Sequence, residues 1–313
     1  MAAFRCYRFG ATIEPIATNV KPAARRRPTV VRCRVVSQPG QRRFEGRAGI
    51  VTGGSSGIGR AIAHRLADEG ADLCLVAAPQ DERALETVLG ELRAKGRRAA
   101  GIAADIGVPD TSERAVATAL ETFGRLDLLA NNAGIAYFED VFATPIEHLD
   151  HTLHVNVRGM FLMGVAAARA MSDRGGGAIA CTASTASFIG EELQVTYNIS
   201  KGGVAELVRS LAVDLAPYGV RVNGVAPGWV RTPATEEIVA DAAQWSKHRS
   251  RIPMDRPAEP AEIAAVVAFL LSDDASYLTG SIVVADGGLT AGYRYTDWDA
   301  VERPPGARKP RRP

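Results

Sequence analysis

Tyr197 and Lys201 stand four residues apart in a stretch with helical character, so both side chains are expected on one helix face. An unperturbed tyrosine titrates near pH ~10 and transfers protons poorly at neutral pH. A neighbouring ammonium group favours the phenolate and lowers the pKa of the phenol. This pair therefore has the residue types and spacing that general acid–base catalysis needs, although the same spacing by itself also describes an ordinary surface pair.

A glycine-rich segment could hold a phosphate group. It reads Thr-Gly-Gly-Ser-Ser-Gly-Ile-Gly over residues 52–59 and lies between an apolar run and an amphipathic stretch. Glycines permit a tight turn close to a pyrophosphate, and the following helix directs free N–H groups at the same anion. A glycine turn without a ligand is the alternative. The placement between strand and helix favours a dinucleotide site that comprises Gly53, Ser55, Ser56, Gly57, Ile58 and Gly59.

The elements that must position these residues follow from hydrophobic patterning. Short apolar runs alternate with amphipathic stretches, and continuous apolar runs are typical of parallel strands covered on both faces. The pattern predicts an α/β fold with a doubly wound, Rossmann-type, parallel seven-stranded sheet in a single domain. The predicted strands are 48–52, 73–77, 98–103, 126–130, 178–182, 221–225 and 281–285, and the predicted helices include 58–69, 82–95, 111–123, 146–170, 198–216 and 260–271.

Charge divides the 313 residues into three parts. Residues 1–44 carry a net charge of +9, residues 45–300 carry −11 and residues 301–313 carry +4. We predict a basic, disordered extension over 1–44, a dinucleotide-binding catalytic domain over 45–292 and a polar, basic tail over 293–313. A transit peptide and a start codon assigned too early are the alternatives for 1–44. A chain that begins at Glu45 is expected to fold and to turn over normally.

The same patterning excludes several classes of partner. An acidic body does not suggest a nucleic-acid groove, and no run of ~18 apolar residues predicts a membrane span. A tether formed by the basic tails is the alternative, and retention on heparin would reveal it.

Metal binding is not expected. The four cysteines, Cys6, Cys33, Cys74 and Cys181, form no CxxC pair, and the last two lie in apolar runs typical of buried strands in a reducing compartment. His148, His151 and His154 share one broad side of a helix, but no carboxylate motif accompanies them, so a solvated or interface face is expected.

An ordered series of motifs resembles that of the short-chain dehydrogenases/reductases. The glycine segment has the spacing TGxxxGxG, Asn131-Asn132-Ala133-Gly134 follows the fourth predicted strand, and Asn156 lies in Val-Asn-Val-Arg-Gly. Ser184 precedes Tyr197 by thirteen residues, Tyr197-Asn-Ile-Ser-Lys201 is a YxxxK motif, and Pro227-Gly228 follows the sixth strand. The resemblance covers about residues 46–290.

The resemblance implies a catalytic role for each of four residues. Tyr197 would exchange a proton with the substrate oxygen, and Ser184 would orient and polarise that oxygen. Lys201 would tune Tyr197 and hold the nicotinamide ribose, and Asn156 would hold a kinked helix and a water that links Lys201 to solvent. Ser187 is a neighbouring hydroxyl, but the thirteen-residue spacing favours Ser184.

The resemblance also implies further contacts to a nicotinamide dinucleotide. Asp105 and Ile106 would lie at the adenine, with a helix cap as the alternative role of Asp105. A turn is the alternative for Asn131 and Asn132. The remaining expected cofactor contacts are Ala133, Gly134, Tyr197, Lys201, Pro227, Gly228, Val230 and Thr232.

The choice between NAD and NADP is left open. The second strand ends at Ala77-Ala78, without the acid that binds the ribose 2′-hydroxyl of NAD or an arginine for the 2′-phosphate of NADP. We expect the two nucleotides to differ less than ~100-fold in kcat/KM, and Ala77→Asp to favour NAD.

The sequence therefore predicts a cytoplasmic NAD(P)-dependent oxidoreductase that interconverts a secondary alcohol and a ketone of a small-molecule substrate. A β-ketoacyl-carrier-protein reductase is the second interpretation, but an acidic carrier needs basic residues near the cleft, and the acidic body of the chain argues against it. A dinucleotide-sensing protein without catalysis is the third, although Tyr197 and Lys201 are both present. A homodimer or homotetramer is expected to form through the helices 146–170 and 198–216, which carry small residues such as Ala166-Ala167-Ala168.

Overall fold

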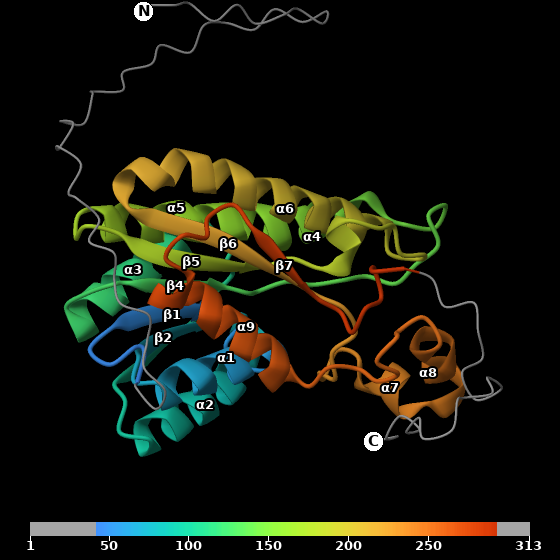
Figure 1. Ribbon diagram of the computed structural model, residues 1–313, viewed down its shortest axis with the longest axis horizontal. Helices are drawn as coiled ribbons and strands as arrows, with labels where there is room; N and C mark the ends of the chain where they lie inside the picture. The colour runs from blue at the N-terminus through green and yellow to red at the C-terminus, as the bar shows by residue number, and fades with distance from the viewer. Residues whose placement is uncertain (1–41, 293–313) are drawn as a thin grey trace, which may run out of the picture. The chain divides into compact units, whose positions relative to one another are not determined.

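The computed structural model describes residues 42–292, which form one parallel sheet with helices on both faces (Figure 1). Its strand order is β3-β2-β1-β4-β5-β6-β7, and every pairing is parallel. The seven-stranded, doubly wound sheet is therefore confirmed. The strands are β1 Ala48–Thr52, β2 Asp72–Ala77, β3 Ala99–Ala103, β4 Leu128–Asn131, β5 Gly177–Thr182, β6 Val220–Pro227 and β7 Ile282–Ala285.

Two groups of helices cover the sheet. One face packs against α1 Gly57–Asp68, α2 Glu82–Ala94 and α9 Pro260–Leu271. The other packs against α3 Pro109–Phe123, α5 Met160–Ser172 and α6 Val195–Leu215, with α4 Ile146–Leu153 beside α6. Two further helices, α7 Glu236–Ala240 and α8 Ala242–Arg249, lie in the segment after β6 and were not predicted. Their short lengths and mixed composition give no clear helical period.

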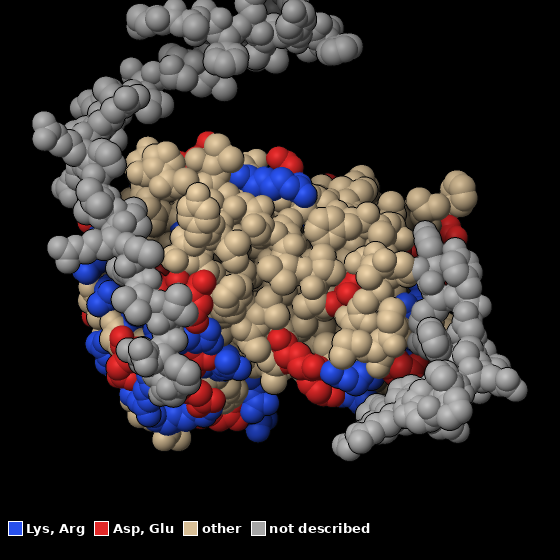
Figure 2. Space-filling view, in the orientation of Figure 1, with Lys and Arg blue, Asp and Glu red and all other residues tan. Residues whose placement is uncertain are grey.

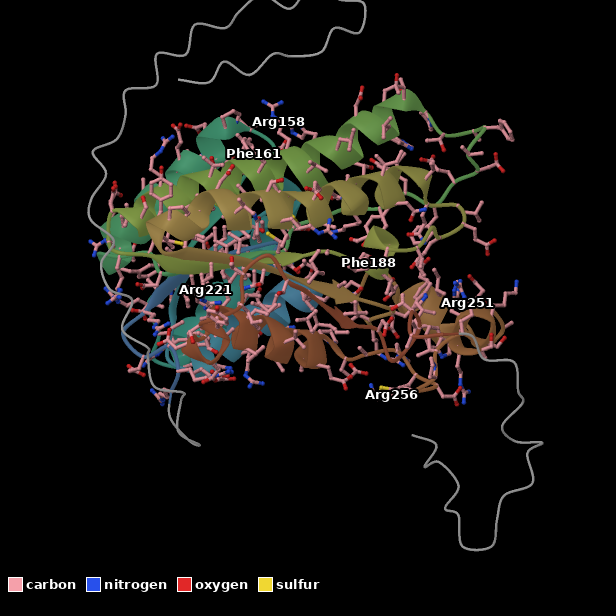
Figure 3. The ribbon with its side chains drawn as sticks, turned by 45° about the horizontal axis from the view of Figure 1, so that its top comes forward. Arg158, Phe161, Phe188, Arg221, Arg251 and Arg256 are labelled. Carbon is pink, nitrogen blue, oxygen red and sulfur yellow. The ribbon has the colours of Figure 1, made fainter. Side chains whose placement is uncertain are left out.

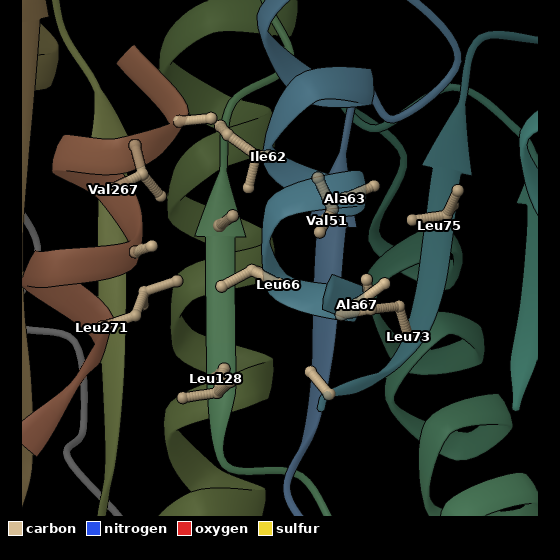
Figure 4. Packing of buried hydrophobic residues seen from close by; sticks show 14 of the residues in the cluster. Val51, Ile62, Ala63, Leu66, Ala67, Leu73, Leu75, Leu128, Val267 and Leu271 are labelled. Carbon is tan, nitrogen blue, oxygen red and sulfur yellow. The ribbon is translucent and has the colours of Figure 1, made fainter. Parts of the chain in front are cut away.

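Alternation along the strands explains their continuous apolar sequence. In β1, Val51 belongs to the core beneath α1 and α9, whereas its neighbour Ile50 belongs to the core on the opposite face. Figure 4 shows the first core, in which Leu66 of α1 and Leu271 of α9 approach Leu128 of β4. Both cores consist of hydrophobic side chains, so both faces of the inner strands are largely apolar.

The predicted helix 146–170 is wrong as a single α-helix. The structure contains α4, a π-helical segment His154–Gly159 and then α5, so that a wider turn separates two α-helices. Single π-turns within helices often occur at functional sites. The break places the side chain of Asn156 inside the protein, where it is fully buried.

The domain begins earlier than predicted. Phe44 is fully buried in the core, and its backbone N–H donates to the carbonyl of Glu69 at 3.0 Å. Arg43 pairs with Glu69, with 2.7 Å between Nη2 and Oε1. The boundary at Glu45 is therefore wrong, since residues 42–44 belong to the fold. The predictions for residues 1–41 and 293–313 fall outside the described residues.

Within residues 42–292 no helix is both long and apolar enough to cross a membrane. The two cysteines of this part of the chain, Cys74 and Cys181, are buried and free, in agreement with their predicted place in strands.

Candidate active site

The four predicted catalytic residues come together at the carboxyl ends of β4 and β5. Tyr197 lies in the first turn of α6, and Lys201 lies one turn later with its Nζ 5.5 Å from the centre of the Tyr197 ring. Lys201 Nζ donates to the carbonyl of Thr182, the last residue of β5, at 2.8 Å. Ser184 follows two residues later and shares a side-chain hydrogen bond with Tyr197. The helix α6 begins at Val195, three residues before its predicted start, so Tyr197 is inside it.

The electrostatics of Tyr197 differ from the expectation. Burial raises the pKa of Tyr197 to about 12, while the hydrogen bond with Ser184 opposes this shift and the charge of Glu191 adds to it. The shift is therefore upward, in the direction opposite to the predicted lowering by Lys201, and desolvation of the phenolate is its largest cause. Burial also lowers the pKa of Lys201 to about 8.

Asn156 joins the π-helical segment to the loop after β4. Its Oδ1 accepts from the backbone N–H of Ile135 at 2.8 Å, and its Nδ2 donates to the Ile135 carbonyl and to Ser200 Oγ, both at 2.9 Å. The role expected for Asn156 in a kinked helix therefore fits its position. A Cβ at Gly134 would lie 3.2 Å from Asn156 Oδ1 and 3.4 Å from Lys201 Nζ, so glycine leaves space beside both groups.

The two neighbouring serines have different partners. Ser187 Oγ donates to the carbonyl of Lys201 at 2.7 Å and accepts from the backbone N–H of Ser184. Ser184 Oγ accepts from the backbone N–H of Ala186 and contacts Tyr197. Ser187 thus holds the loop against α6, which agrees with the preference for Ser184 as the residue beside Tyr197.

The glycine loop has the geometry of a phosphate cradle. Gly53 and Gly57 adopt φ of +65° and +50°, a region that side chains disfavour. A Cβ at Gly59 would lie only 1.9 Å from the carbonyl oxygen of Gly53, so the turn can close only around glycine. Ser56 is the N-cap of α1 and makes no side-chain capping bond, which leaves the first-turn N–H groups of that helix for an anion. These residues fit the pyrophosphate of a dinucleotide.

Thr52 is a positioning residue that the sequence analysis did not select. Its buried hydroxyl accepts from the backbone N–H groups of Asn132 and Ala133 at 2.8 and 3.0 Å, which ties the end of β1 to the loop after β4. Only its place at the last residue of β1, next to the glycines, could have drawn attention to it.

Asn131, the last residue of β4, and Asn132, which follows it, both bond to the framework with their side chains. Asn131 Nδ2 donates to the Met160 carbonyl at 2.8 Å, and Asn132 Oδ1 accepts from Thr182 Oγ1 at 3.0 Å. Asn132 Nδ2 also donates to the carbonyl of Thr52 at 3.2 Å. Any nucleotide contact here falls to the backbone of this loop and to Ala133 and Gly134.

Asp105 is held by a partner that the sequence analysis did not assign to it. Its Oδ1 accepts from the backbone N–H of Gly107 at 2.8 Å, and its Oδ2 lies 2.9 Å from His154 Nε2. These bonds lower the pKa of Asp105 against the opposing effect of its desolvation. The N-cap of α3 is Val108, so the alternative role of Asp105 as a helix cap is wrong. Ile106 is buried against the π-helical segment, since a Cβ at Gly159 would lie 2.7 Å from it.

The loop after β6 approaches the glycine loop. A Cβ at Gly57 would lie 3.4 Å from Thr232, and the backbone N–H of Thr232 donates to Thr235 Oγ1 at 3.0 Å. Pro227 ends β6, and Gly228 packs so closely on Asp286 that a Cβ would lie 2.9 Å from its Cα. Val230 is buried in the core, so only its backbone is available to a nucleotide.

The end of β2 lies where it was predicted, but the two alanines there are not equivalent. Ala77 is the last strand residue, is 3% exposed and belongs to the core. Ala78 follows the strand and is partly exposed. A carboxylate added at Ala77 would therefore lie in the core. We place the substitution that should favour NAD at Ala78 and not at Ala77.

The three helical histidines do not converge on one partner: His148 and His151 both contact Tyr137, and His154 contacts Asp105. His148 stacks on Tyr137 with 3.9 Å between ring centres, His151 Nδ1 lies 2.8 Å from the Tyr137 hydroxyl, and His154 pairs with Asp105. Among residues 42–292 no group of three or more metal-ligating side chains converges.

A separate pocket of about 750 Å³ lies beside α8 and the start of α9. Its lining includes Trp245, Arg231 and Arg256 but none of the four predicted catalytic residues. The arginines are already engaged: Arg256 pairs with Glu262 at 2.7 Å, and Arg231 pairs with Glu236 at 3.1 Å. This pocket is therefore not the site that the sequence predicted.

The chain is similar to known oxidoreductases over most of its length. A family model described as enoyl-(acyl carrier protein) reductase matches residues 53–290. The L-rhamnose 1-dehydrogenase (NAD(P)(+)) of Sphingomonas sp. strain SKA58 is 37% identical over 79% of this chain and 97% of its own length. The enzyme of the same name from Azotobacter vinelandii is 40% identical, over 77% and 95%. The crystal structure of a short-chain type dehydrogenase/reductase from Mycobacterium marinum is 35% identical, covers 80% of this chain and 98% of its own, and superposes with a TM-score of 0.75.

Proposed function

The chain belongs to the short-chain dehydrogenase/reductase family and is an NAD(P)-dependent oxidoreductase acting on CH–OH groups, and from this premise we propose that Tyr197 is its acid–base. The observation that carries the proposal is the convergence of Tyr197, Ser184 and Lys201 at the end of β5. We propose Asn156 as the residue that holds the loop and the π-helical segment beside them.

In the proposed reaction, Ser184 and Tyr197 bind the same substrate oxygen. During reduction, Tyr197 donates its phenolic proton to the carbonyl oxygen, and during oxidation its phenolate accepts the hydroxyl proton. The nicotinamide, when bound, supplies or accepts the hydride at the carbinol carbon. The raised pKa of Tyr197 keeps the proton donor for reduction present at neutral pH, so oxidation should become faster as the pH rises.

The nucleotide would lie across the carboxyl end of the sheet, where the strand order reverses between β1 and β4. Gly53, Ser55, Ser56, Gly57, Ile58 and Gly59 would hold its pyrophosphate. Asp105 and Ile106 would hold its adenine. Lys201 and the loop from Asn131 to Gly134 would hold a ribose, and Pro227, Gly228, Val230 and Thr232 would enclose the nicotinamide.

Tyr197→Phe tests the acid–base role because it removes the proton and keeps the ring. We expect turnover to fall by about 10²–10⁴-fold, the usual contribution of general acid–base catalysis, while nucleotide binding persists. Steady-state kinetics and nucleotide titration measure the two quantities. Ser187→Ala is the matched control, since this hydroxyl bonds to the Lys201 carbonyl, and its turnover should stay within a few-fold of wild type. Near-normal turnover of Tyr197→Phe would remove Tyr197 from the mechanism.

A sugar is a candidate substrate because relatives of this chain are named L-rhamnose 1-dehydrogenases. We propose that oxidation of the ring carbon that carries the anomeric hydroxyl be tested first, with L-rhamnose and both nucleotides. A β-ketoacyl-carrier-protein reductase is the rival, but the body of the chain carries a net charge of −11, which disfavours an acidic carrier. A nucleotide sensor without catalysis is the other rival, and the intact Tyr197–Lys201 pair argues against it.

We propose a homodimer or homotetramer, with no nucleic-acid or membrane partner. The outer faces of the α4, α5 and α6 helices expose Ile146, Phe161, Ile199 and Val213. The edge strand β7 and the region around it expose Val284, Phe269 and Tyr277, and Figure 2 shows a broad area without charged residues there. Apolar patches of this kind mark interaction surfaces. The alanines that the sequence analysis assigned to the subunit interface fit that role less well, since Ala167 and Ala168 are buried inside the subunit.

A cytoplasmic location is also a proposal, supported by the free, buried thiols of Cys74 and Cys181. Burial raises the pKa of each thiol to about 12, so neither is reactive. Organellar import through residues 1–44 remains the alternative, and microscopy of a fluorescent fusion of the full chain distinguishes the two.

A further inference from the structure

The segment between Ser184 and Tyr197 is held more by hydrogen bonds than by apolar burial. It connects the end of β5 to the start of α6. Two of its large apolar side chains, Phe188 and Leu193, are 47% and 55% exposed, so packing alone does not fix its path. Leu193 also adopts a φ of +60°, a conformation that bulky side chains disfavour. The placement of Ser184 relative to Tyr197 therefore depends on the polar groups that hold this segment.

Glu191 lies within this segment and bonds to residues at both of its ends. Its Oε1 accepts from Thr185 Oγ1 at 2.9 Å, and Thr185 directly follows Ser184. Its backbone carbonyl accepts from Asn198 Nδ2 at 2.7 Å, and Asn198 directly follows Tyr197. Glu191 thus connects the neighbours of both proposed catalytic hydroxyls through two hydrogen bonds.

A third hydrogen bond fixes the Glu191 carboxylate. Gln194 Nε2 donates to Glu191 Oε2 at 3.1 Å, so each carboxylate oxygen has its own donor. Both donors, Thr185 and Gln194, are buried, so the surrounding structure holds them in place. Hydrogen bonds to an ionised acceptor are roughly twice as strong as those between neutral groups. The Glu191 side chain is therefore a firm anchor for the start of the segment.

Another hydrogen bond ties the segment to α6 one turn beyond Tyr197. Ser187 Oγ donates to the Lys201 carbonyl at 2.7 Å. Glu191, by contrast, bonds to the residues that directly follow Ser184 and Tyr197. Loss of the Ser187 hydroxyl leaves the bonds of Glu191 in place, so the two ties can be tested separately.

The Glu191 carboxylate also acts on the proton that the proposed reaction moves. Charged groups next to Tyr197 include the Lys201 ammonium, 5.5 Å from the ring centre, and Glu191. The charge of Glu191 raises the pKa of Tyr197, in the same direction as burial. A negative charge disfavours the phenolate, which is the base for oxidation, and favours the phenol, which is the acid for reduction.

We propose that Glu191 is a positioning residue of the reaction, which clamps the loop that carries Ser184 to the first turn of α6 and so holds the Ser184 and Tyr197 hydroxyls on one substrate oxygen. The proposal rests on the proposed function, because the spacing of these hydroxyls matters only if both act in the reaction. A displacement of about 1 Å in a reacting group can cost about 100-fold in rate. Loss of the clamp should therefore lower kcat and leave nucleotide affinity unchanged.

Two substitutions break the clamp from opposite sides of one hydrogen bond. Glu191→Ala removes the acceptor, and Thr185→Val removes the donor hydroxyl while keeping the side-chain shape. The substrate is L-rhamnose or cyclohexanol, whichever the wild-type full chain oxidises. We expect each substitution to lower kcat about 10–100-fold and to keep the nucleotide Kd within about 3-fold. The double variant should be no slower than the slower single variant, because both act through the same bond.

Glu191→Gln separates the clamp from the charge. A glutamine amide oxygen still accepts from Thr185, so the maximal kcat should stay within about 3-fold of wild type. Without the negative charge, the pH profile of oxidation should move to lower pH, because the phenolate forms more readily. Glu192→Gln is the matched control, since Glu192 is the exposed neighbouring carboxylate, and it should change neither kcat nor the profile.

Hydrogen–deuterium exchange tests the clamp without a substrate. Glu191→Ala and Thr185→Val should raise deuterium uptake in residues 185–198 and leave the other elements of the fold unchanged, because the segment loses its anchor. Glu191→Gln and Glu192→Gln should exchange like wild type.

The outcomes separate this proposal from the proposed function. Lost turnover in Tyr197→Phe supports the proposed function and near-normal turnover contradicts it, whatever the Glu191 variants do. Unchanged kcat in Glu191→Ala, additive losses in the double variant, or an unmoved pH profile in Glu191→Gln would overturn the role of Glu191 and leave the proposed function intact. If neither substrate is oxidised, unchanged exchange overturns the clamp, and raised exchange confined to the segment supports it.

Discussion

Lys201 is buried in the protein interior, where desolvation disfavours its charged form. It is 3% exposed, and its ammonium donates to the carbonyl of Thr182 at 2.8 Å. Burial lowers its pKa from 10.5 to about 8. An ammonium held this way costs stability, and retaining it makes sense where the charge is needed for nucleotide binding and proton transfer.

Lys201→Met should therefore stabilise the fold while it impairs the reaction. Below pH ~8 the lysine is protonated in both folded and unfolded states, so the cost of burying the charge is fully present. Between pH ~8 and ~10.5 the unfolded state binds the extra proton, and the stability of wild type rises with pH. We expect the variant to be more stable by about 2 kcal/mol at pH 7, with the advantage vanishing toward pH ~10. Denaturant unfolding at both pH values measures it, and a pH-independent difference would contradict the assignment.

The same substitution gives a functional readout. Turnover should fall and nucleotide binding should weaken, because the ribose contact and the positive charge beside Tyr197 disappear together. The pH–rate profile should also move. An unchanged profile would show that Lys201 does not influence Tyr197.

We predict that Ala78 makes the choice of nucleotide weak, because its methyl group neither accepts from a 2′-hydroxyl nor pairs with a 2′-phosphate. Ala78 follows β2 and is partly exposed, and Arg60, in the first turn of α1, is paired with Glu91 at 2.7 Å. We expect NADH and NADPH to differ less than ~100-fold in kcat/KM. Ala78→Asp should shift the preference toward NADH, because a carboxylate accepts from the 2′-hydroxyl and repels the 2′-phosphate.

Ala77→Asp is the contrasting variant for this experiment. Ala77 is buried in the core, so a carboxylate there should mainly lower stability. Side-by-side kinetics with both nucleotides, together with melting temperatures, distinguish the two positions. Strong selectivity of wild type for either nucleotide would contradict the prediction.

At the scale of elements, the segment before β1 is part of the fold. Phe44 is buried in the core that also includes residues of α1, and Arg43 pairs with Glu69 at the end of α1 and with Asp274. A charged run in the sequence thus contains one large apolar residue that packs in the core. Position in a basic stretch is therefore a poor guide to where a domain begins.

Phe44→Ala should lower the free energy of unfolding by about 3–5 kcal/mol, as for other large core side chains. Arg42→Ala is the control, because Arg42 is 61% exposed, and its effect should stay within about 0.5 kcal/mol. A chain that begins at Glu45 should lose at least as much stability as Phe44→Ala, whereas one that begins at Arg42 should keep it. Thermal or denaturant unfolding compares the four proteins. Equal stability of the chains beginning at Arg42 and Glu45 would contradict the packing of Phe44.

At the scale of the whole molecule, exposed apolar side chains favour an assembly. Phe161 on α5 is 48% exposed and Ile199 on α6 is 50% exposed. Figure 3 shows Phe161 and Arg158 on the same outward side of the helical layer. Burial of these side chains against a second copy of the chain removes apolar surface from water and thus favours association.

Phe161→Glu should weaken that assembly, because burying a carboxylate in an apolar interface is costly. Light scattering at micromolar concentration should give a dimer or tetramer mass for wild type and a smaller mass for the variant. Glu113→Gln on α3 is a surface control that should keep the wild-type mass. A monomeric mass for wild type would refute the oligomer.

The sequence by itself determined the sheet, its strands and the identity of the residues around Tyr197. Continuous apolar runs leave few alternatives to a parallel sheet, and motif spacing identifies Ser184, Tyr197 and Lys201 because each lies at a definite place in a strand or helix. These are local properties, and local patterning reports them well.

Only the tertiary structure decided how those residues are held. Four features depend on contacts between distant segments. They are the hydrogen bonds from the loop after β4 to the Thr52 hydroxyl, the pairing of Asp105 with His154, the burial of Phe44 and the different environments of Ala77 and Ala78. The upward shift of the Tyr197 pKa is of the same kind, because desolvation is set by everything packed around the ring and not by the lysine four residues away.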